Sequence, residues 1–160
     1  RQGLEAIRQI KSRHPDALVA AGTVTSPQEM ATAVAAGADF CVSPGISASL
    51  LKSARDLGVL FVPGVATASD IMLGIEHELD TFKLFPAEAI GGRNLLRSLA
   101  GPFPQVRFCP TGGLNPQNYR DYLALPNVVC IGGSWMVSDD LVSGQDWEKI
   151  RTLAAEAMSD

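Results

Sequence analysis

The sequence has little of what a protein needs to bind nucleic acids or to enter a membrane. Its 13 lysine and arginine residues are outnumbered by 17 aspartate and glutamate residues, which gives a net charge of −4. The basic residues are scattered rather than clustered, so they give no support for binding to nucleic acids or anionic membranes. No apolar run approaches the ~20 residues that a transmembrane helix needs. We therefore expect neither a nucleic-acid nor a membrane partner.

Cysteine and histidine are also scarce, with three and two residues respectively. The cysteines Cys41, Cys109 and Cys130 show no C-x-x-C spacing, and no histidine accompanies them. We therefore expect no metal site and no cofactor. An odd number of thiols, all in predicted strands, favours buried structural cysteines and a reducing, cytoplasmic compartment.

Short β-rich runs alternate with longer helical patterns, and glycine or proline separates them. The starts of successive runs are 20 to 24 residues apart, the length of one strand plus one helix with short connections. This repeat predicts consecutive βα units and a parallel sheet, in one domain over residues 1–160. The predicted strands are residues 17–24, 39–43, 59–63, 81–86, 105–111 and 128–132.

Capping patterns delimit the helices between these strands. Ser26 and Pro27, with Glu29 three residues after the serine, are typical of a helix start, and Gly37 and Gly58 of helix ends. The predicted helices are residues 3–11, the stretch between Ser26 and Gly37, and residues 48–57, 69–78, 92–100, 115–123 and 146–158.

A repeat of this length usually builds the eight-stranded (β/α)8 TIM barrel, of which about six βα units are found in this chain. The first residue is Arg1 rather than methionine, and the first predicted element is a helix. We therefore expect a barrel domain whose first two βα units are missing. An open, doubly wound sheet of six parallel strands fits the same count and is the alternative.

Lys83 is the one charged residue in the apolar run of residues 81–86. Because side chains alternate along a strand and parallel strands are covered on both faces, we expect Lys83 to be buried. Burial disfavours the ammonium form and leaves a nucleophilic amine that can attack a carbonyl near neutral pH. A lysine that reaches solvent from a strand end is the alternative interpretation.

Glycine and hydroxyl residues follow the last two predicted strands, as Thr111-Gly112-Gly113 and Gly132-Gly133-Ser134. In parallel α/β folds ligands bind at the carboxyl ends of strands, and this is the usual phosphate position of an eight-stranded barrel. Glycine lets backbone amides approach an anion closely. Two such pairs on neighbouring strands favour a phosphate site over ordinary tight turns.

Five motifs together resemble the class I aldolases that cleave 2-keto-3-deoxy-6-phosphogluconate (KDPG) and 4-hydroxy-2-oxoglutarate (KHG), and the resemblance covers essentially the whole chain. It implies a (β/α)8 barrel without cofactors, usually a homotrimer, that acts in the Entner–Doudoroff pathway. It also implies release of pyruvate from a keto acid, with glyceraldehyde 3-phosphate or glyoxylate as the second product. The motifs are GTV at 22–24, FKLFPAE at 82–88, GPF at 101–103, VRFCPTGG at 106–113 and CIGGSW at 130–135.

The resemblance also implies a role for individual residues. Lys83 matches the lysine that forms a Schiff base with the keto carbon. Thr23 and Thr111 match threonines that contact the keto acid, Phe85 matches an aromatic wall of the pocket, and Pro44 belongs to a substrate-side loop. The residues that match the phosphate-binding loops are Gly112, Gly113, Gly133 and Ser134.

The general base is a separate question, because the family places its glutamate base, and an arginine for the substrate carboxylate, upstream of Arg1. Glu88 is the only acid directly beside the strand end that carries Lys83. We therefore predict Glu88 as the candidate acid–base group. An acid here also favours the N-terminus of the following helix, and both interpretations stay open.

Two other functions fit the same residues. One is a non-catalytic barrel fragment that binds sugar phosphates, and the other is a phosphate-binding barrel isomerase or synthase in which Lys83 is an electrostatic group. A covalent adduct between Lys83 and pyruvate distinguishes the aldolase from both.

Overall fold

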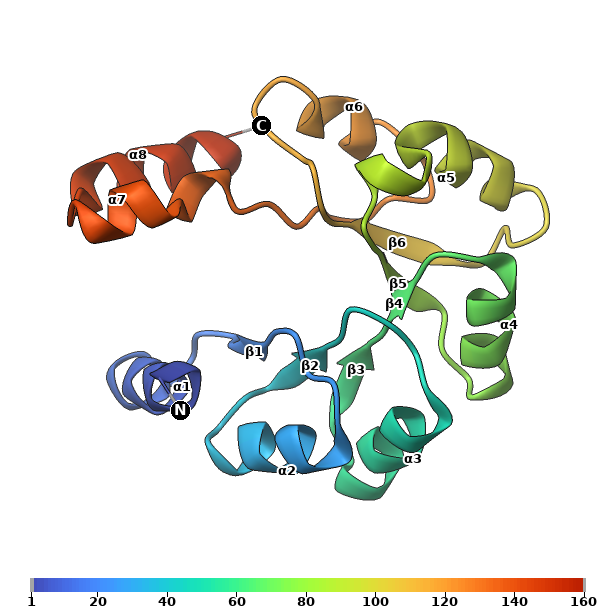
Figure 1. The fold of residues 1–160 in the computed structure, drawn as a ribbon, viewed down its shortest axis with the longest axis horizontal. Coiled ribbons are helices and arrows are strands. Elements are labelled where there is room, and N and C mark those ends of the chain that lie inside the picture. The colour runs from blue at the N-terminus through green and yellow to red at the C-terminus, as the bar shows by residue number, and fades with distance from the viewer. Residues whose placement is uncertain (1, 160) are drawn as a thin grey trace.

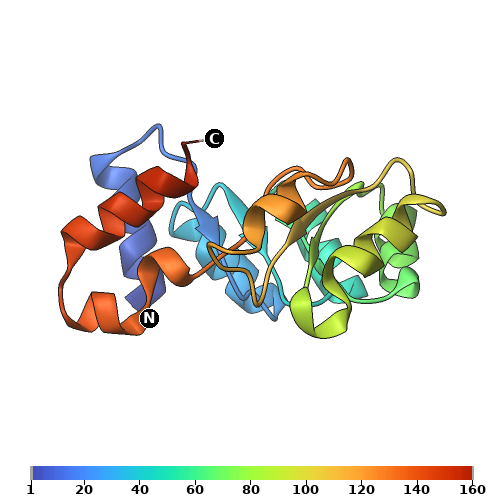
Figure 2. The same cartoon turned by 90° about the horizontal axis from the view of Figure 1, so that it is seen from above.

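The computed structural model describes residues 2–159, which form a curved ring of βα units (Figure 1). The strands line the inner side of the ring and the helices lie on its outer side. Figure 2, turned by 90°, shows that the ring is shallow relative to its length. The helices are α1 (Gln2–Arg13), α2 (Pro27–Ala35), α3 (Ala48–Leu57), α4 (Ala68–Glu76), α5 (Gly92–Ala100), α6 (Tyr119–Leu123), α7 (Asp139–Ser143) and α8 (Trp147–Ala157).

The strands form two parallel three-stranded sheets, ordered β1-β2-β3 and β4-β5-β6. Pro63 separates β3 from β4 because proline has no N–H to give to the ladder. Its carbonyl still accepts a hydrogen bond from the Lys83 amide at 2.9 Å, so β3 and β4 together act as one bent strand that joins the sheets. The strands are β1 (Ala20–Ala21), β2 (Phe40–Val42), β3 (Leu60–Val62), β4 (Gly64–Val65), β5 (Thr81–Leu84) and β6 (Arg107–Pro110).

The strand predicted over residues 128–132 is wrong, because this segment forms only two isolated bridges to β6 and the residue after it. Phe108 pairs with Val128, an offset of 20 residues, whereas Thr111 pairs with Gly132, an offset of 21. The extra residue interrupts the ladder as a bulge does. The other five predicted strands are present, although β1 covers only two of the eight predicted residues.

The predictions of α3 and α5 match the observed bounds, and local capping explains those of α3. The Ser47 hydroxyl accepts a hydrogen bond from the Leu50 amide at 3.3 Å, and Gly58 ends α3 with a φ of 63°. Sequence reasoning missed α7 and two short 3-10 helices, η1 (Glu88–Ile90) and η2 (Trp135–Val137).

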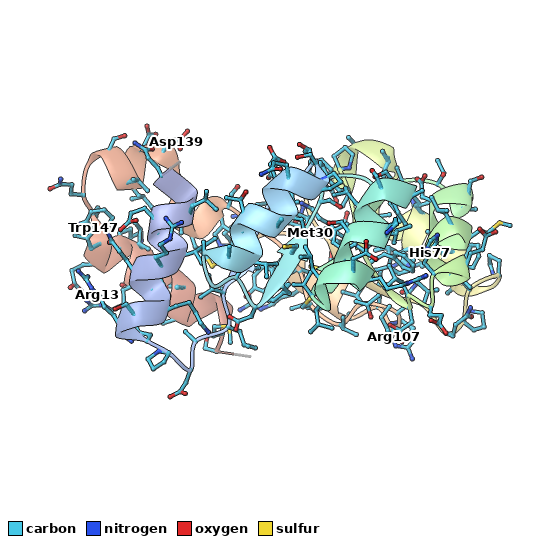
Figure 3. All side chains as sticks on the ribbon, turned by 90° about the horizontal axis from the view of Figure 1, so that it is seen from below. Arg13, Met30, His77, Arg107, Asp139 and Trp147 are labelled. Atoms are coloured by element: carbon cyan, nitrogen blue, oxygen red, sulfur yellow. The ribbon has the colours of Figure 1, made fainter. Side chains whose placement is uncertain are left out.

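The helices cover the outer face of the strands alone (Figure 1), and two hydrophobic clusters fill the space between them. One cluster contains the fully buried Phe82, Phe108 and Tyr122, and the other contains Met30, which lies under α2 in Figure 3. A doubly wound sheet carries helices on both faces, so that alternative is wrong and the fold is of the α/β-barrel class. None of the helices within residues 2–159 is both apolar and long enough to cross a bilayer.

Candidate active site

Lys83 lies on the inner face of β5, between Gly64 on β4 and Cys109 on β6. Its ammonium nitrogen is 4.4 Å from the centroid of the Phe85 ring, which projects from the same side of the chain. Burial lowers the pKa of Lys83, and the neighbouring Cys109 acts in the opposite direction. The sequence predicts that Lys83 is buried, whereas the structure shows it partly buried. Of the residues of β5, only Phe82 and Leu84 are fully buried, and they face the helices on the outer side.

Thr111 joins the end of β6 to the neighbouring 128–132 segment. Its amide donates to the Leu84 carbonyl at 2.9 Å, and its hydroxyl donates to the Cys109 carbonyl at 3.3 Å. A Cβ atom at Gly132 would lie 2.4 Å from the Thr111 hydroxyl oxygen, so glycine is required at this close approach. The two glycine pairs are therefore held side by side.

The backbone at these glycine pairs presents amide groups that have no backbone hydrogen-bond acceptor among residues 2–159. Gly112 and Gly113 have φ angles of 102° and 80°, in the left-handed region that glycine tolerates. Between residues 2 and 159, the amides of Gly112, Gly113, Gly133 and Ser134 donate no backbone hydrogen bond. Four such amides on two adjacent segments offer donors to an anionic ligand.

Thr23 and Pro44 follow β1 and β2 at the same carboxyl edge of the strands. Thr23 is exposed and has a φ of 58°, a strained conformation that is common at functional sites. Ser43, which the sequence did not single out, is fully buried beside Pro44. Its hydroxyl donates to the Gly45 carbonyl at 2.5 Å and accepts from the Gly64 amide at 3.4 Å, which ties the loop to β4.

Glu88 begins η1, and its exposed carboxylate accepts a hydrogen bond from the hydroxyl of Tyr122. No hydrogen bond or ion pair joins Glu88 to Lys83 among the residues that the structure describes. The role of Glu88 as an acid–base group thus stays a prediction. Tyr122 was not predicted, because its partner lies 34 residues away in the sequence.

The cysteines differ from the structural role that the sequence favours, because only Cys41 is buried and Cys130 is exposed. A hydrogen bond between Cys109 and Cys130 raises the pKa of Cys109 and lowers the pKa of Cys130 to about 7. This pair lies next to Lys83 through the pairing of Lys83 with Cys109. Across residues 2–159, no cluster of three or more histidine, cysteine, aspartate or glutamate side chains is arranged to hold a metal ion.

A partly buried lysine, an aromatic wall, a hydroxyl and two glycine turns thus lie at the carboxyl edge of a curved parallel sheet. This arrangement defines an α/β-barrel protein of the kind that binds its ligands at the ends of the strands. The chain belongs to the aldolase family described as KDPG and KHG aldolase, which matches residues 1–153. The resemblance inferred from the motifs is confirmed.

Relatives and solved structures agree with this membership. The KHG/KDPG aldolase of Escherichia coli K12 is 52% identical over 155 residues, which are 97% of this chain and 73% of that protein. A crystal structure of KDPG aldolase from Legionella pneumophila, with pyruvate captured as a covalent carbinolamine, superposes with a TM-score of 0.94 at 42% identity and covers 96% of this chain and 75% of that one. The Zymomonas mobilis enzyme with 3-phosphoglycerate has a TM-score of 0.88 at 46% identity, over 98% of this chain and 73% of that chain.

Proposed function

We propose that this chain is a class I aldolase that cleaves KDPG to pyruvate and glyceraldehyde 3-phosphate, or KHG to pyruvate and glyoxylate. The observation that carries the proposal is Lys83, an amine with a lowered pKa on the inner face of β5, beside two glycine turns with free amides. Relatives named as aldolases support the same activity, since they are 51% and 52% identical to this chain over 156 and 155 aligned residues.

The chemistry follows from the amine. Lys83 Nζ attacks the keto carbon, and the resulting carbinolamine loses water to give an iminium ion. When the bond between carbons 3 and 4 breaks, its electron pair moves toward the iminium, and the proton of the 4-hydroxyl leaves as the aldehyde forms. Protonation of the enamine and hydrolysis then release pyruvate and the free lysine. The lowered pKa of Lys83 increases the fraction of neutral amine, which is the form that the first step needs.

The substrate has two ends to be bound, the keto acid and the phosphate. We assign Thr23 and Thr111 to the keto acid end, with Phe85 as an apolar wall beside Lys83 and Pro44 on the opposite loop. Orientation of the carboxylate by hydroxyl groups reduces the entropy lost in aligning the reacting carbon. The far phosphate is assigned to the amides of Gly112, Gly113, Gly133 and Ser134.

Glu88 is our candidate for the acid–base group that moves the proton. It belongs to the same strand end as Lys83, and its carboxylate is exposed. Its hydrogen bond to Tyr122 also fits a positioning role.

The assembly and location of the protein are also proposals. We propose that these βα units belong to an eight-stranded barrel, which the repeat length and the two curved parallel sheets support. The homotrimer is proposed from the family resemblance alone. A cytoplasmic location is supported by Cys41, Cys109 and Cys130, which are all free thiols.

Borohydride trapping tests the proposed activity. The chain is incubated with pyruvate and borohydride, and the adduct is located by mass spectrometry of peptides. We expect one reduced adduct on Lys83, its loss in Lys83→Met, and its retention in Lys52→Met, which changes an exposed lysine paired with Asp56. Binding of a phosphorylated ligand without any pyruvate adduct would support the isomerase, synthase or non-catalytic alternatives instead.

A further inference from the structure

Tyr122 is a fully buried residue of α6 whose hydroxyl is directed at the rim of the candidate site. The ring belongs to the hydrophobic cluster under α4, α5 and α6, and the hydroxyl donates to the Glu88 carboxylate. Burial and this hydrogen bond raise the pKa of Tyr122, so the hydroxyl remains a donor across the ordinary pH range. A phenylalanine would fill the same volume, which indicates that the hydroxyl serves the bond to Glu88.

The Glu88 side chain lies directly on the Gly112-Gly113 turn. A Cβ atom at Gly113 would lie 2.6 Å from the Cβ and 2.7 Å from the Cγ of Glu88. Gly92, at the start of α5, is equally close to the bond, since a Cβ there would lie 2.4 Å from the Tyr122 hydroxyl oxygen. Three segments therefore close around one hydrogen bond.

The backbone of the same residues holds the turn from its other side. The Glu88 amide donates to the Gly112 carbonyl at 3.1 Å, and the Ala87 amide donates to the Thr111 carbonyl at 2.8 Å. The carbonyls of the turn are thus occupied by residues 87 and 88, whereas the amides of Gly112 and Gly113 donate no backbone hydrogen bond to the described residues. Main chain and side chain of Glu88 together fix the orientation of these amides.

We infer that Tyr122 is a positioning residue for the phosphate end of the substrate. Through Glu88 it fixes the Gly112-Gly113 turn, and it also holds the negative charge of Glu88 in one place beside a site for an anion. The reacting lysine lies on a different strand and needs no contact with this turn. Tyr122 therefore sets the preference for phosphorylated over unphosphorylated keto acids. The inference rests on the proposed function only in assigning the phosphate to this turn.

Tyr122→Phe separates the two ends of the site. Affinity for the phosphate end is measured as the Kd of 3-phosphoglycerate by calorimetry, and the keto acid end as the rate of borohydride trapping with pyruvate, which has no phosphate. We expect the Kd to rise about 3- to 10-fold, the range for loss of one hydrogen bond, with an unchanged trapping rate. Glu88→Gln is the comparison for the charge, because its amide oxygen still accepts from Tyr122 while the negative charge beside the anion site is removed. Its Kd should therefore not rise above that of the unaltered chain.

The other outcomes distinguish this inference from the aldolase proposal. An unchanged Kd in Tyr122→Phe overturns the inference, and so does an equal loss of 3-phosphoglycerate binding and pyruvate trapping, which would indicate a general loss of structure. If the unaltered chain traps pyruvate but does not bind 3-phosphoglycerate, the inference fails and the aldolase proposal stands. If it binds 3-phosphoglycerate but traps no pyruvate, the aldolase proposal fails, and the change in Kd still decides the role of Tyr122.

Discussion

Gly64→Ala tests whether the loop that carries Pro44 is held closely against the strand beside Lys83. A Cβ atom at Gly64 would lie 2.2 Å from the carbonyl oxygen of Pro44 and 2.3 Å from its carbonyl carbon. Both are backbone atoms, so a side-chain rotation cannot relieve the clash. The loop would have to move by about 1 Å to restore a normal contact distance.

The expected loss of stability has two parts. Overpacking of this kind costs about 1–3 kcal/mol, and the shift weakens the hydrogen bond from the Gly64 amide to Ser43, worth about 1 kcal/mol. We expect the free energy of unfolding to fall by about 2–4 kcal/mol. For a chain of this size the midpoint of thermal unfolding then falls by about 4–16 °C.

Urea unfolding followed by circular dichroism measures this change. Gly45→Ala is the matched control in the same loop, because no atom lies within 4 Å of a Cβ atom at that position. We expect the control to stay within about 0.5 kcal/mol of the unaltered chain. Equal unfolding free energies for Gly64→Ala and Gly45→Ala would refute the reasoning.

Three further predictions concern other parts of the molecule. Cys109 lowers the pKa of Cys130 to about 7. Alkylation of Cys130 by iodoacetamide should therefore be about tenfold slower at pH 6 than at the high-pH plateau. If the midpoint of the pH–rate curve lies at the pKa of an ordinary thiol, the prediction is contradicted. Hydrogen bonds from the Val19 amide and from Lys11 lower the pKa of Asp39, so its stabilising effect is present above the ordinary carboxyl pKa and is lost as pH falls through the lowered value. Asp39→Asn should therefore lower the thermal midpoint at pH 7 and reduce its change between pH 7 and pH 3, and an unchanged pH profile would count against the bond. Asn127→Ala removes the hydrogen bond that its buried side-chain amide donates to the Leu96 carbonyl at 2.9 Å. Urea unfolding should therefore show a loss of about 0.5–1.5 kcal/mol, the net contribution of one hydrogen bond, and an unchanged free energy of unfolding would contradict it.

The elements that the sequence predicts well are those with local signals. Ser47 and Gly58 bound α3 through contacts within a few residues, so the pattern alone is sufficient. The segment at 128–132 has the composition of a strand, but its pairing depends on the offset to β6, which changes between the two bridges. No local pattern encodes such a change of register.

The candidate site also contains both residues that the sequence predicts and contacts that it does not. Lys83 and the glycine pairs can be predicted because their positions follow from strand alternation and from the rule that ligands bind at strand ends. The bond of Tyr122 to Glu88 and that of Cys109 to Cys130 join residues far apart in the sequence, so only the folded chain reveals them. The degree of exposure of Lys83 also depends on the whole ring.

Pro63 connects the backbone of Lys83 to the junction between the two sheets. The two hydrophobic clusters share two neighbours, Ile46 and Leu79, which pack against both of them. The Lys83 amide donates a hydrogen bond to the carbonyl of Pro63, which separates β3 from β4. Because burial lowers the pKa of Lys83, any opening of the chain at Pro63 that lets water reach the amine would raise this pKa. We therefore expect the reactivity of Lys83 to depend on the integrity of this one junction between the two sheets.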